Sequence, residues 1–396
     1  MPIVVFVLAV AVFAQGTSEF MVSGLLEQIA ADVGVSLGTA GLLTSLFAAG
    51  MVIGAPVIAM TAGRLPIRYS VATFLGLFCA AHVIGAVTTG FAVLLITRVV
   101  AAVSNAGFLA IALAALPRLA GPAMIGRATS VVVSGITVAC IAGVPAGTLL
   151  GQVWGWRSAF WAVAVISAAV LMPVWVMVGR GVGEDDRPAA SGPSMRREWA
   201  VVGRGPVLVA VAAGILVNAA TFAGFTYLGA ITAGICEGAG WVPVVLALFG
   251  LGSLAGVTLT GRYSDRHRWR IITAGTAVLI GVWVLAALTA HTLIGVLIMS
   301  AVAGAGAFGI GSTLIATIVQ TAVPTAPRIA GALATTAFNI GAVLGPATAG
   351  LVVNCTGHTT TALWYSAAFT TTAAGVVLVG RGRVTCPVEQ VRADAR

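Results

Sequence analysis

The sequence contains no lysine, and charged residues of all kinds make up only 8% of its 396 positions. A soluble globular domain carries about 25% charged residues, so an ordinary soluble enzyme or binding domain is excluded. Apolar residues make up 59% of the chain. This composition predicts an integral membrane protein with the lipid bilayer as a partner.

Residue patterns that carry covalent or metal chemistry are also missing. The five cysteines and four histidines are scattered without metal-ligand spacing. No Walker loop is present, and no nucleophile stands in a strand-to-helix context. We therefore expect neither catalysis nor ATP-driven transport, and we expect no metal and no cofactor.

The net charge is +9, and all twenty basic residues are arginine. A basic protein can bind nucleic acid, but these arginines stand in short loops between apolar runs rather than on one face. Membrane orientation explains them better, because cytoplasmic loops carry the excess of arginine. The loops on one side hold most of them, whereas the other side keeps only Arg157. We therefore expect no nucleic acid partner, and both termini on the cytoplasmic side of a cell (plasma or inner) membrane.

Apolar runs separated by short polar turns predict an all-α membrane protein of twelve transmembrane helices in two pseudo-symmetric six-helix bundles. No arginine precedes the first run, so we interpret it as a spanning helix and not as a signal peptide. The predicted spans are 2–26, 38–62, 70–88, 91–115, 128–150, 158–178, 207–228, 242–261, 271–290, 293–318, 329–353 and 361–380.

The longest polar break divides the chain into two halves. We predict an N-terminal bundle at 1–178, a cytoplasmic linker at 179–205, a C-terminal bundle at 206–380 and a cytoplasmic tail at 381–396. The halves repeat: five residues of the first half recur 202 positions later and two recur 201 positions later. These pairs are Phe47 and Phe249, Gly50 and Gly252, Gly54 and Gly256, Arg64 and Arg266, Arg68 and Arg270, Arg127 and Arg328, and Pro145 and Pro346. Such repeats favour a transporter with its site between the halves near the midplane, although channels and membrane enzymes can also contain repeats.

Glu19 is the single charged side chain between Pro2 and Leu26. A charge near the centre of a spanning helix costs roughly 2.5–3.5 kcal/mol on insertion scales. Gln15 precedes it by one helical turn, so both side chains share a polar stripe that should face protein or water. Glu19 is either an acid that titrates and touches the substrate or a structural acid bonded to a neighbouring helix.

Arg98 lies well within the fourth apolar run. A buried guanidinium needs an acidic or carbonyl partner, and Glu19 is the only carboxylate within the predicted first-half helices. We therefore hypothesise that Arg98 and Glu19 pair, the alternative being an arginine that snorkels to the outer surface. His82, in the third run, is better explained as hydrogen-bonded packing than as a proton relay. Polar and aromatic residues that could line a substrate site, or simply pack, are Gln15, Asn218, Thr221, Phe222, Phe225 and Asn339.

Two further stretches are typical of helices that pack closely or change their arrangement. Between the eighth and ninth runs stands Gly261-Arg-Tyr-Ser-Asp265-Arg266, with Arg268 and Arg270 close behind. Gly256 and Gly261 should let the eighth helix approach a neighbour, and Asp265 can accept hydrogen bonds from a helix start or an arginine. The alternative is a loop of positive charge that only sets topology.

The fifth run contains Gly143, Pro145, Gly147 and Gly151. Pro145 removes a backbone hydrogen bond, and the glycines permit tight packing against another helix. An ordinary kinked helix would show the same residues.

Together these motifs resemble the major facilitator superfamily. Its loop signature G-x-x-x-D-R-x-G-R-R is kept at Gly261, Asp265, Arg266 and Arg270, whereas the first-half copy keeps only Arg64 and Arg68. The fifth run resembles the antiporter motif of proton-coupled drug exporters, which helps to close the outward end of the cavity. Arg98 matches the family's arginine that is associated with proton transfer.

Within the superfamily, Gln15-Gly-Thr-Ser-Glu19-Phe20 resembles the twelve-helix drug:proton antiporters. Ser104-Asn105-Ala-Gly107-Phe108 and Gly155-Trp156-Arg157-Ser-Ala-Phe160-Trp161 look most like chloramphenicol exporters. The resemblance implies a monomer that exports chloramphenicol by proton antiport, driven by the proton motive force, and so confers antibiotic resistance. It places Glu19 and Arg98 in proton coupling and Asn105 in the substrate site. A multidrug, sugar or metabolite exporter of the same superfamily is the alternative, followed by a channel or a non-transporting receptor.

Overall fold

The computed structural model describes residues 2–61, 66–121, 124–181, 205–235, 238–323 and 330–384. Within these ranges, twelve helices are long and apolar enough to cross a membrane. This confirms the all-α fold and the number of spans predicted from the sequence. Arg64, the central part of the predicted linker (182–204) and the predicted tail from residue 385 onward lie outside the described residues.

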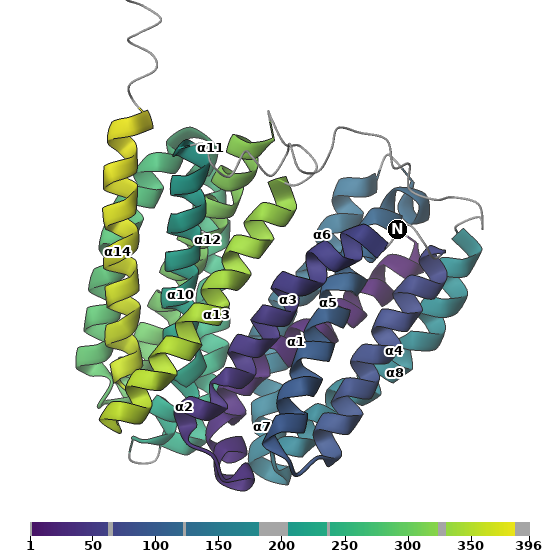
Figure 1. The fold of residues 1–396 in the computed structure, drawn as a ribbon, viewed down its shortest axis with the longest axis horizontal. Coiled ribbons are helices and arrows are strands. Elements are labelled where there is room, and N and C mark those ends of the chain that lie inside the picture. Colours follow the sequence, from purple (N-terminus) through teal and green to yellow (C-terminus); the bar gives the residue numbers. More distant parts are fainter. Residues whose placement is uncertain are drawn as a thin grey trace, which may run out of the picture.

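The helices form two bundles side by side, with the early helices in one and the late helices in the other (Figure 1). The N-terminal bundle contains α1 (Ile3–Val33), α2 (Leu37–Ala40), α3 (Leu42–Thr61), α4 (Ile67–Val87), α5 (Phe91–Ala120), α6 (Ile125–Val138), the π-helix η2 (Ala139–Gly143), α7 (Val144–Trp154) and α8 (Trp156–Gly181). The C-terminal bundle contains α10 (Gly205–Ala233), the 3-10 helix η4 (Gly238–Trp241), α11 (Val242–Thr289), α12 (Leu293–Ala322), α13 (Ala330–Thr356) and α14 (Thr361–Val384). Helices α8 and α14 therefore continue three and four residues into the segments predicted as linker and tail.

Helix α1 is longer than the sequence predicts. It continues to Val33 and ends at Gly34, whose φ of 70° is the left-handed conformation that glycine adopts readily at a helix end. The extra turns carry Glu27 and Asp32, so Glu19 is not the only carboxylate on the first-half helices, and that prediction was wrong. Asp32 forms an ion pair of 2.5 Å with Arg157 of α8, which ties the end of α1 to its own bundle.

The fifth span is built from three consecutive elements, α6, η2 and α7. Pro145 stands at the start of α7 and lacks the N–H that would bond to the carbonyl one turn earlier. The turn that precedes it is wound as a π-helix, a local widening typical of helices whose hydrogen-bond ladder is interrupted. The predicted irregularity at Pro145 is therefore present.

Helix α11 includes the segment between the eighth and ninth runs, which was expected to be a loop. The helical backbone continues through residues 262–270. Two positions far apart in α11 lie against adjacent positions of α12: Thr260 bonds to the Gly309 carbonyl, and Gly275 lies against Ile310. In a straight helix, residues 15 positions apart would be about 22 Å apart. The helix therefore doubles back and supplies two spans.

The internal repeat is preserved in the packing. In the first half, the glycines of α3 face α5, and in the second half their counterparts in α11 face α12. These contacts are Gly50 with Val99, Gly54 with Val103, Gly252 with Ala301, and Gly256 with Ala305. In each case, both residues of the second-half contact stand 202 positions after the corresponding residues of the first-half contact. The two halves are therefore related in three dimensions as the sequence predicts.

Gly261 differs from the other motif glycines. A Cβ atom at this position would meet open space within 4 Å. The close approach of the eighth span to its neighbour occurs two turns earlier, at Gly252 and Gly256. The close packing predicted for Gly256 is therefore confirmed, whereas the same prediction for Gly261 was wrong.

The halves meet closely at the end of the molecule where α1 terminates. Gly229 of α10 faces the Ser23 carbonyl of α1, where a Cβ would stand only 2.4 Å from the oxygen. Two hydrogen bonds also join the halves there. The Gly38 N–H donates to Asn354 Oδ1 (3.1 Å), and Gln152 Nε2 donates to the Ala239 carbonyl (2.6 Å).

Candidate functional site

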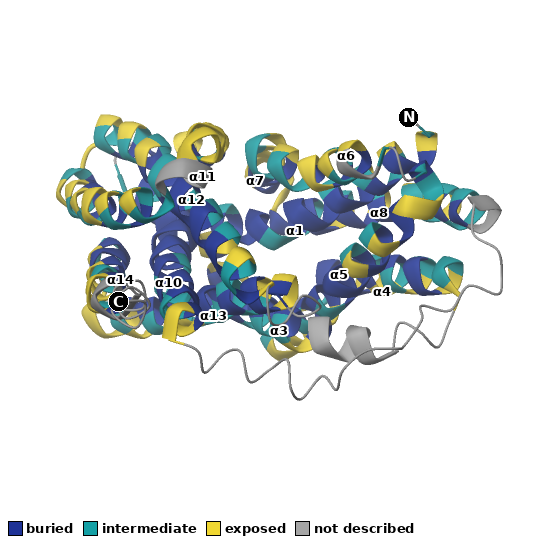
Figure 2. Ribbon diagram, turned by 90° about the horizontal axis from the view of Figure 1, so that it is seen from above, coloured by how far each residue is buried: buried dark blue, intermediate teal, exposed yellow. Residues whose placement is uncertain are grey.

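Helix α1 carries the candidate site and lies at the centre of the molecule. Seen from above, α1 and α10 are largely buried between the other helices (Figure 2). Four glycines of the fifth span lie along α1 in order and allow its backbone to approach. They are Gly135 against Ala9 and Phe13, Gly143 against Thr17, Gly147 against Met21, and Gly151 against Leu25.

The second half also packs two helices closely at glycines. Gly341 and Gly345 of α13 lie against the backbone of α10, at Ile215 and Ala219. The tight packing predicted from the glycines of the fifth run is therefore present, and the second half shows the same kind of packing. Whether Gly143, Pro145, Gly147 and Gly151 also close the outward end of a cavity stays a prediction.

Arg98 is buried, with 1% of its surface exposed. Its Nη1 donates to Ser18 Oγ (2.8 Å) and its Nη2 donates to the Ser18 carbonyl (2.9 Å). The guanidinium also lies 4.3 Å from the centre of the Phe47 ring, a cation–π distance. Arg98 therefore neither snorkels to the surface nor, among the described residues, forms an ion pair with Glu19. Both predicted arrangements were wrong.

Glu19 is the next residue along α1 and is half-buried. Successive side chains of a helix point about 100° apart, so Ser18 faces Arg98 while Glu19 points to another side. The charges of Glu19 and Arg98 still act on one another without direct contact. The proton-coupling roles of Glu19 and Arg98 stay predictions.

His82 completes a chain of hydrogen bonds with Ser18 and Arg98. Its Nε2 lies 2.6 Å from Ser18 Oγ, and its Nδ1 lies 2.7 Å from the Phe78 carbonyl. A carbonyl oxygen only accepts, so Nδ1 carries the proton, and Nε2 of the neutral ring accepts from the Ser18 hydroxyl. The hydrogen bonding predicted for His82 is therefore present, and it leads directly to Arg98.

Gln15 is a buried residue whose side-chain polar atoms both lack hydrogen-bond partners among the described residues. The side chain is 1% exposed, and neither Nε2 nor Oε1 has a hydrogen-bond partner among the described residues. On α3, the hydroxyls of Thr44 and Ser45 are also buried without a hydrogen-bond partner among the described residues. A buried polar group without a partner costs about 1–3 kcal/mol, and in native proteins such groups usually mark a function or a bound molecule.

A cluster of aromatic rings joins the two halves beside Glu19. Phe20 of α1 lies 6.0 Å from Phe222 and 6.1 Å from Phe225, both on α10, measured between ring centres. Phe225 in turn lies 4.8 Å from Phe249 of α11. These rings surround a small cavity of about 10 Å³. The structure thus brings the predicted substrate residue Phe222 next to the polar stripe of α1.

The three predicted asparagines are placed differently. Asn218 Nδ2 donates to the Phe338 carbonyl (2.6 Å), which ties α10 to α13, and Asn339 Nδ2 donates to Thr335 of its own helix (3.0 Å). Neither of these two lines the aromatic cavity. Asn105 is buried within α5. The structure assigns the amide nitrogens of Asn218 and Asn339 to packing, and the substrate-binding roles of all three stay predictions.

The loop-motif arginines bind within their own halves. The Arg68 guanidinium stacks on Trp175 of α8 at 4.0 Å from the ring centre, and Arg268 donates to Gln320 of α12. Arg270 is exposed. The side chains of Asp265 and Arg266 lie outside the described residues, so their predicted role as a lock remains a prediction.

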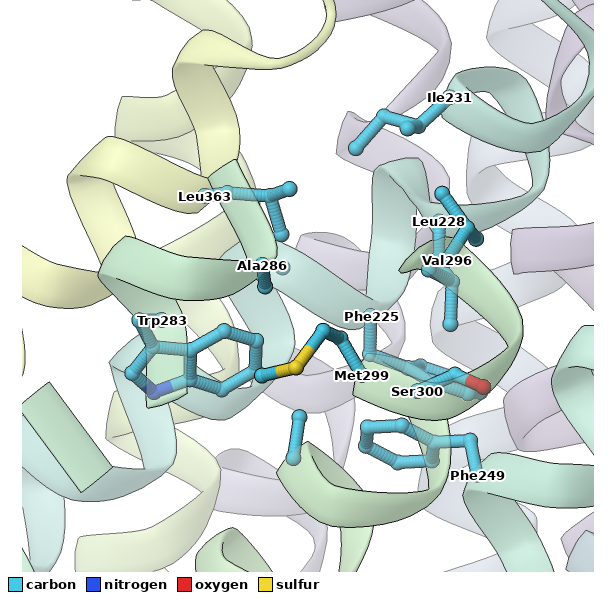
Figure 3. Close-up of a pocket in the computed structure, with 12 residues that line it drawn as sticks. Phe225, Leu228, Ile231, Phe249, Trp283, Ala286, Val296, Met299, Ser300 and Leu363 are labelled. Carbon is cyan, nitrogen blue, oxygen red and sulfur yellow. The ribbon is translucent and has the colours of Figure 1, made fainter. Parts of the chain in front are cut away.

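Sequence reasoning missed a second cavity, which occupies the position in the C-terminal half that corresponds to Arg98 (Figure 3). Ser300 stands 202 positions after Arg98, and Phe249 stands 202 after Phe47. A space of about 20 Å³ remains where the first half holds a guanidinium. The 202-residue repeat, applied to Arg98, could have located it, and it shows that the buried charge belongs to one half only.

Residues 8–346 match the sequence model of the Major Facilitator Superfamily. The chain belongs to the Major Facilitator Superfamily. This confirms the family predicted from the motifs, and with the twelve apolar helices it makes the protein a multi-pass membrane transporter.

Sequence alignments with related proteins extend over most of this chain. A "Chloramphenicol resistance protein" of Streptomyces lividans is 47% identical over 364 residues, which is 91% of each chain. An "Inner membrane transport protein YdhP" of Escherichia coli (strain K12) is 28% identical over 348 residues, or 88% of each chain. A crystal structure of a bacterial homologue of the human lysosomal transporter Spinster, described as inward-facing and occupied, matches with a TM-score of 0.75 and 16% identity. That match covers 96% of both chains and supports the fold.

Proposed function

We propose that this transporter exports chloramphenicol in exchange for protons and thereby confers resistance to the drug. The observation that carries the proposal is the 47% identity, over 91% of both chains, to a protein named for chloramphenicol resistance. The proton motive force supplies the energy, and a monomer carries out the cycle.

The interface between the halves suits an uncharged aromatic drug. Chloramphenicol carries no charge, so its binding must come from hydrogen bonds and from aromatic or apolar contact. The rings of Phe20, Phe222 and Phe225 supply the apolar contact from both halves. The free amide of Gln15, with one donor group and one acceptor atom, supports polar recognition one turn from Glu19.

Glu19 is the group that we assign to proton coupling. In the proposed cycle, the drug binds from the inside while Glu19 is deprotonated, and the carrier then turns outward. A proton reaches Glu19 from outside, the drug leaves, and the protonated carrier returns and releases the proton inside. For a neutral drug and one proton, 100 mV of membrane potential is worth about 2.3 kcal/mol, roughly a fiftyfold concentration ratio.

The arginine distribution supports an assignment of the two ends. With the termini in the cytoplasm, the end where α1 terminates faces outward. The Gln152–Ala239 and Gly38–Asn354 bonds then close the outer end, next to the glycines of the fifth span. Transport requires these contacts to break in the outward-open state.

The test is drug accumulation in energised cells, with and without an uncoupler, for the wild type and Glu19→Gln. The proposal expects low, uncoupler-sensitive accumulation in the wild type and full accumulation in Glu19→Gln. Uncoupler-sensitive extrusion by Glu19→Gln would refute the role of Glu19. Protection against other compounds without protection against chloramphenicol would favour the multidrug or metabolite exporter, and recovery of chemically altered drug would indicate an enzyme.

A further inference from the structure

The hydrogen-bond chain from His82 to Arg98 has a fixed direction. His82 Nδ1 donates to the Phe78 carbonyl, so Nε2 draws the Ser18 proton toward itself. The lone pairs of Ser18 Oγ are then turned toward Arg98 Nη1, while the Ser18 carbonyl holds Nη2. The two terminal nitrogens of Arg98 thus donate to two acceptors of Ser18, its hydroxyl and its carbonyl oxygen. This two-pronged arrangement fits the planar guanidinium.

We propose that His82 is a positioning residue that, through Ser18, holds Arg98 beside Glu19 but out of direct contact with it. The proposal rests on the proton-coupling role assigned to Glu19 above. Its consequence is that the carboxyl group remains available to take up a proton, because the nearest positive charge is bound to the neighbouring residue instead.

The surroundings of His82 support a positioning role. The imidazole is 1% exposed and packs between Phe78, with ring centres 4.3 Å apart, and Phe160, at 5.8 Å. Its ring therefore has little freedom to turn, and both nitrogens are occupied. A buried side chain held in this way orients the hydroxyl that it accepts from, as partners of functional groups commonly do.

Glu19 has few other ionisable neighbours. Among the described residues, the charged group that acts on Glu19 is Arg98 of α5, and the other titratable group within its influence is the uncharged thiol of Cys140 in η2. Arg98 is also the charged group that acts on His82. A change in the pH dependence of Glu19 chemistry after substitution of His82 or Ser18 would therefore be transmitted by Arg98.

Loss of either link should let Arg98 turn toward Glu19. A carboxylate in contact with a guanidinium holds its negative charge more strongly, so protons would compete less well for it. Transport should then need a more acidic solution. We expect the pH profile of proton-coupled chloramphenicol transport in membrane vesicles to move to lower pH by about one unit, within the range that a contacting opposite charge produces.

The decisive set of variants is His82→Leu, Ser18→Ala, their combination, and His82→Gln. The two single variants should move the profile in the same direction, and the combination should move it no further than Ser18→Ala alone, because His82 acts on Arg98 through the Ser18 hydroxyl. His82→Gln should retain the wild-type profile, since its amide oxygen can accept from Ser18 as Nε2 does. Ser167→Ala is the matched control: Ser167 is equally buried, its hydroxyl has no partner among the described residues, and the profile should not move.

An unchanged profile in Ser18→Ala and His82→Leu would overturn the inference, as would shifts that add in the combined variant. If His82→Leu does not accumulate in the membrane, Ser18→Ala and its comparison with Ser167→Ala decide the matter. Glu19→Gln, measured in parallel, separates this inference from the proposed function. Loss of coupling in Glu19→Gln together with unchanged profiles in the other variants would refute the inference alone, whereas coupled transport by Glu19→Gln would refute the function.

Discussion

Gln152 and Asn354 stand 202 positions apart, and each takes part in one hydrogen bond to the opposite half at the same end of the molecule. Gln152 Nε2 donates to the Ala239 carbonyl, and Asn354 Oδ1 accepts from the Gly38 N–H. Their partners are separated by 201. The pair is therefore a pseudo-two-fold arrangement in which each half supplies one amide side chain and one backbone group.

This pair should hold the end closed. One neutral hydrogen bond contributes about 0.5–1.5 kcal/mol. Gln152→Ala with Asn354→Ala removes both bonds, about 1–3 kcal/mol together, and should favour opening by roughly 5- to 150-fold. The measurement is the rate at which an impermeant maleimide labels a cysteine placed at Ser23, which is 2% exposed at this contact. The native cysteines are first replaced. Gln28→Ala is the control, and equal labelling rates in all variants would show that the two bonds do not restrain opening.

Phe222 should contribute to drug binding through its ring. Substitution Phe222→Ala removes the contact with Phe20 across the halves, and we expect chloramphenicol to bind about tenfold more weakly, or about 1.4 kcal/mol. Binding to purified protein by calorimetry measures this. Phe369→Ala on α14, whose ring lies against Tyr365 and does not line the aromatic cavity, serves as the control. Equal affinities for the wild type and Phe222→Ala would remove Phe222 from the binding site.

Gln15 should affect stability and binding in opposite directions. Gln15→Leu keeps the approximate shape of the side chain and removes two buried polar atoms without partners. The drug-free protein should gain about 1–3 kcal/mol of unfolding free energy, seen as a higher Tm, while the stabilisation that added chloramphenicol gives should fall. A variant that loses stability without drug would show that the amide already has a partner in the protein.

Gly143 and Gly151 of the fifth span should not accept a branched side chain without a loss of stability. A Cβ at Gly151 would stand 2.2 Å from Leu25 Cδ2, and at Gly143 it would stand 2.0 Å from Thr17 Oγ1. We expect Gly151→Val and Gly143→Val to lower unfolding free energy by about 1–3 kcal/mol, measured by thermal unfolding in detergent. Gly76→Ala is the control, because a Cβ there meets open space. Wild-type Tm values in the valine variants would contradict this packing.

Much of the fold could be predicted because its causes are local. Twelve apolar runs give twelve spans, and the 202-residue repeat of Gly50 and Gly54 gives the matching helix contacts in both halves. The length of α1 could not be predicted from charge alone. The charged residue Glu27 ends the apolar run and so sets the end of the predicted span, but the helix continues until Gly34 ends it.

The partner of Arg98 shows where sequence reasoning stops. A search for opposite charge selects Glu19, whereas in the structure the two terminal nitrogens of Arg98 donate to the hydroxyl and the carbonyl of Ser18. The choice depends on the rotation of α1 about its axis, which separates adjacent side chains by about 100°. That rotation is set by the glycines of α6 and α7 against α1, a tertiary contact that no single run of sequence reveals.

Drug-driven proton movement in proteoliposomes tests the central claim most directly. Purified protein is reconstituted into vesicles loaded with chloramphenicol, which are then diluted into drug-free buffer. Proton flux is followed with a pH-sensitive dye, for the wild type and Glu19→Gln at equal protein content. The account predicts inward proton flux that depends on the gradient in the wild type and none in Glu19→Gln. Wild-type proton flux in Glu19→Gln would contradict it.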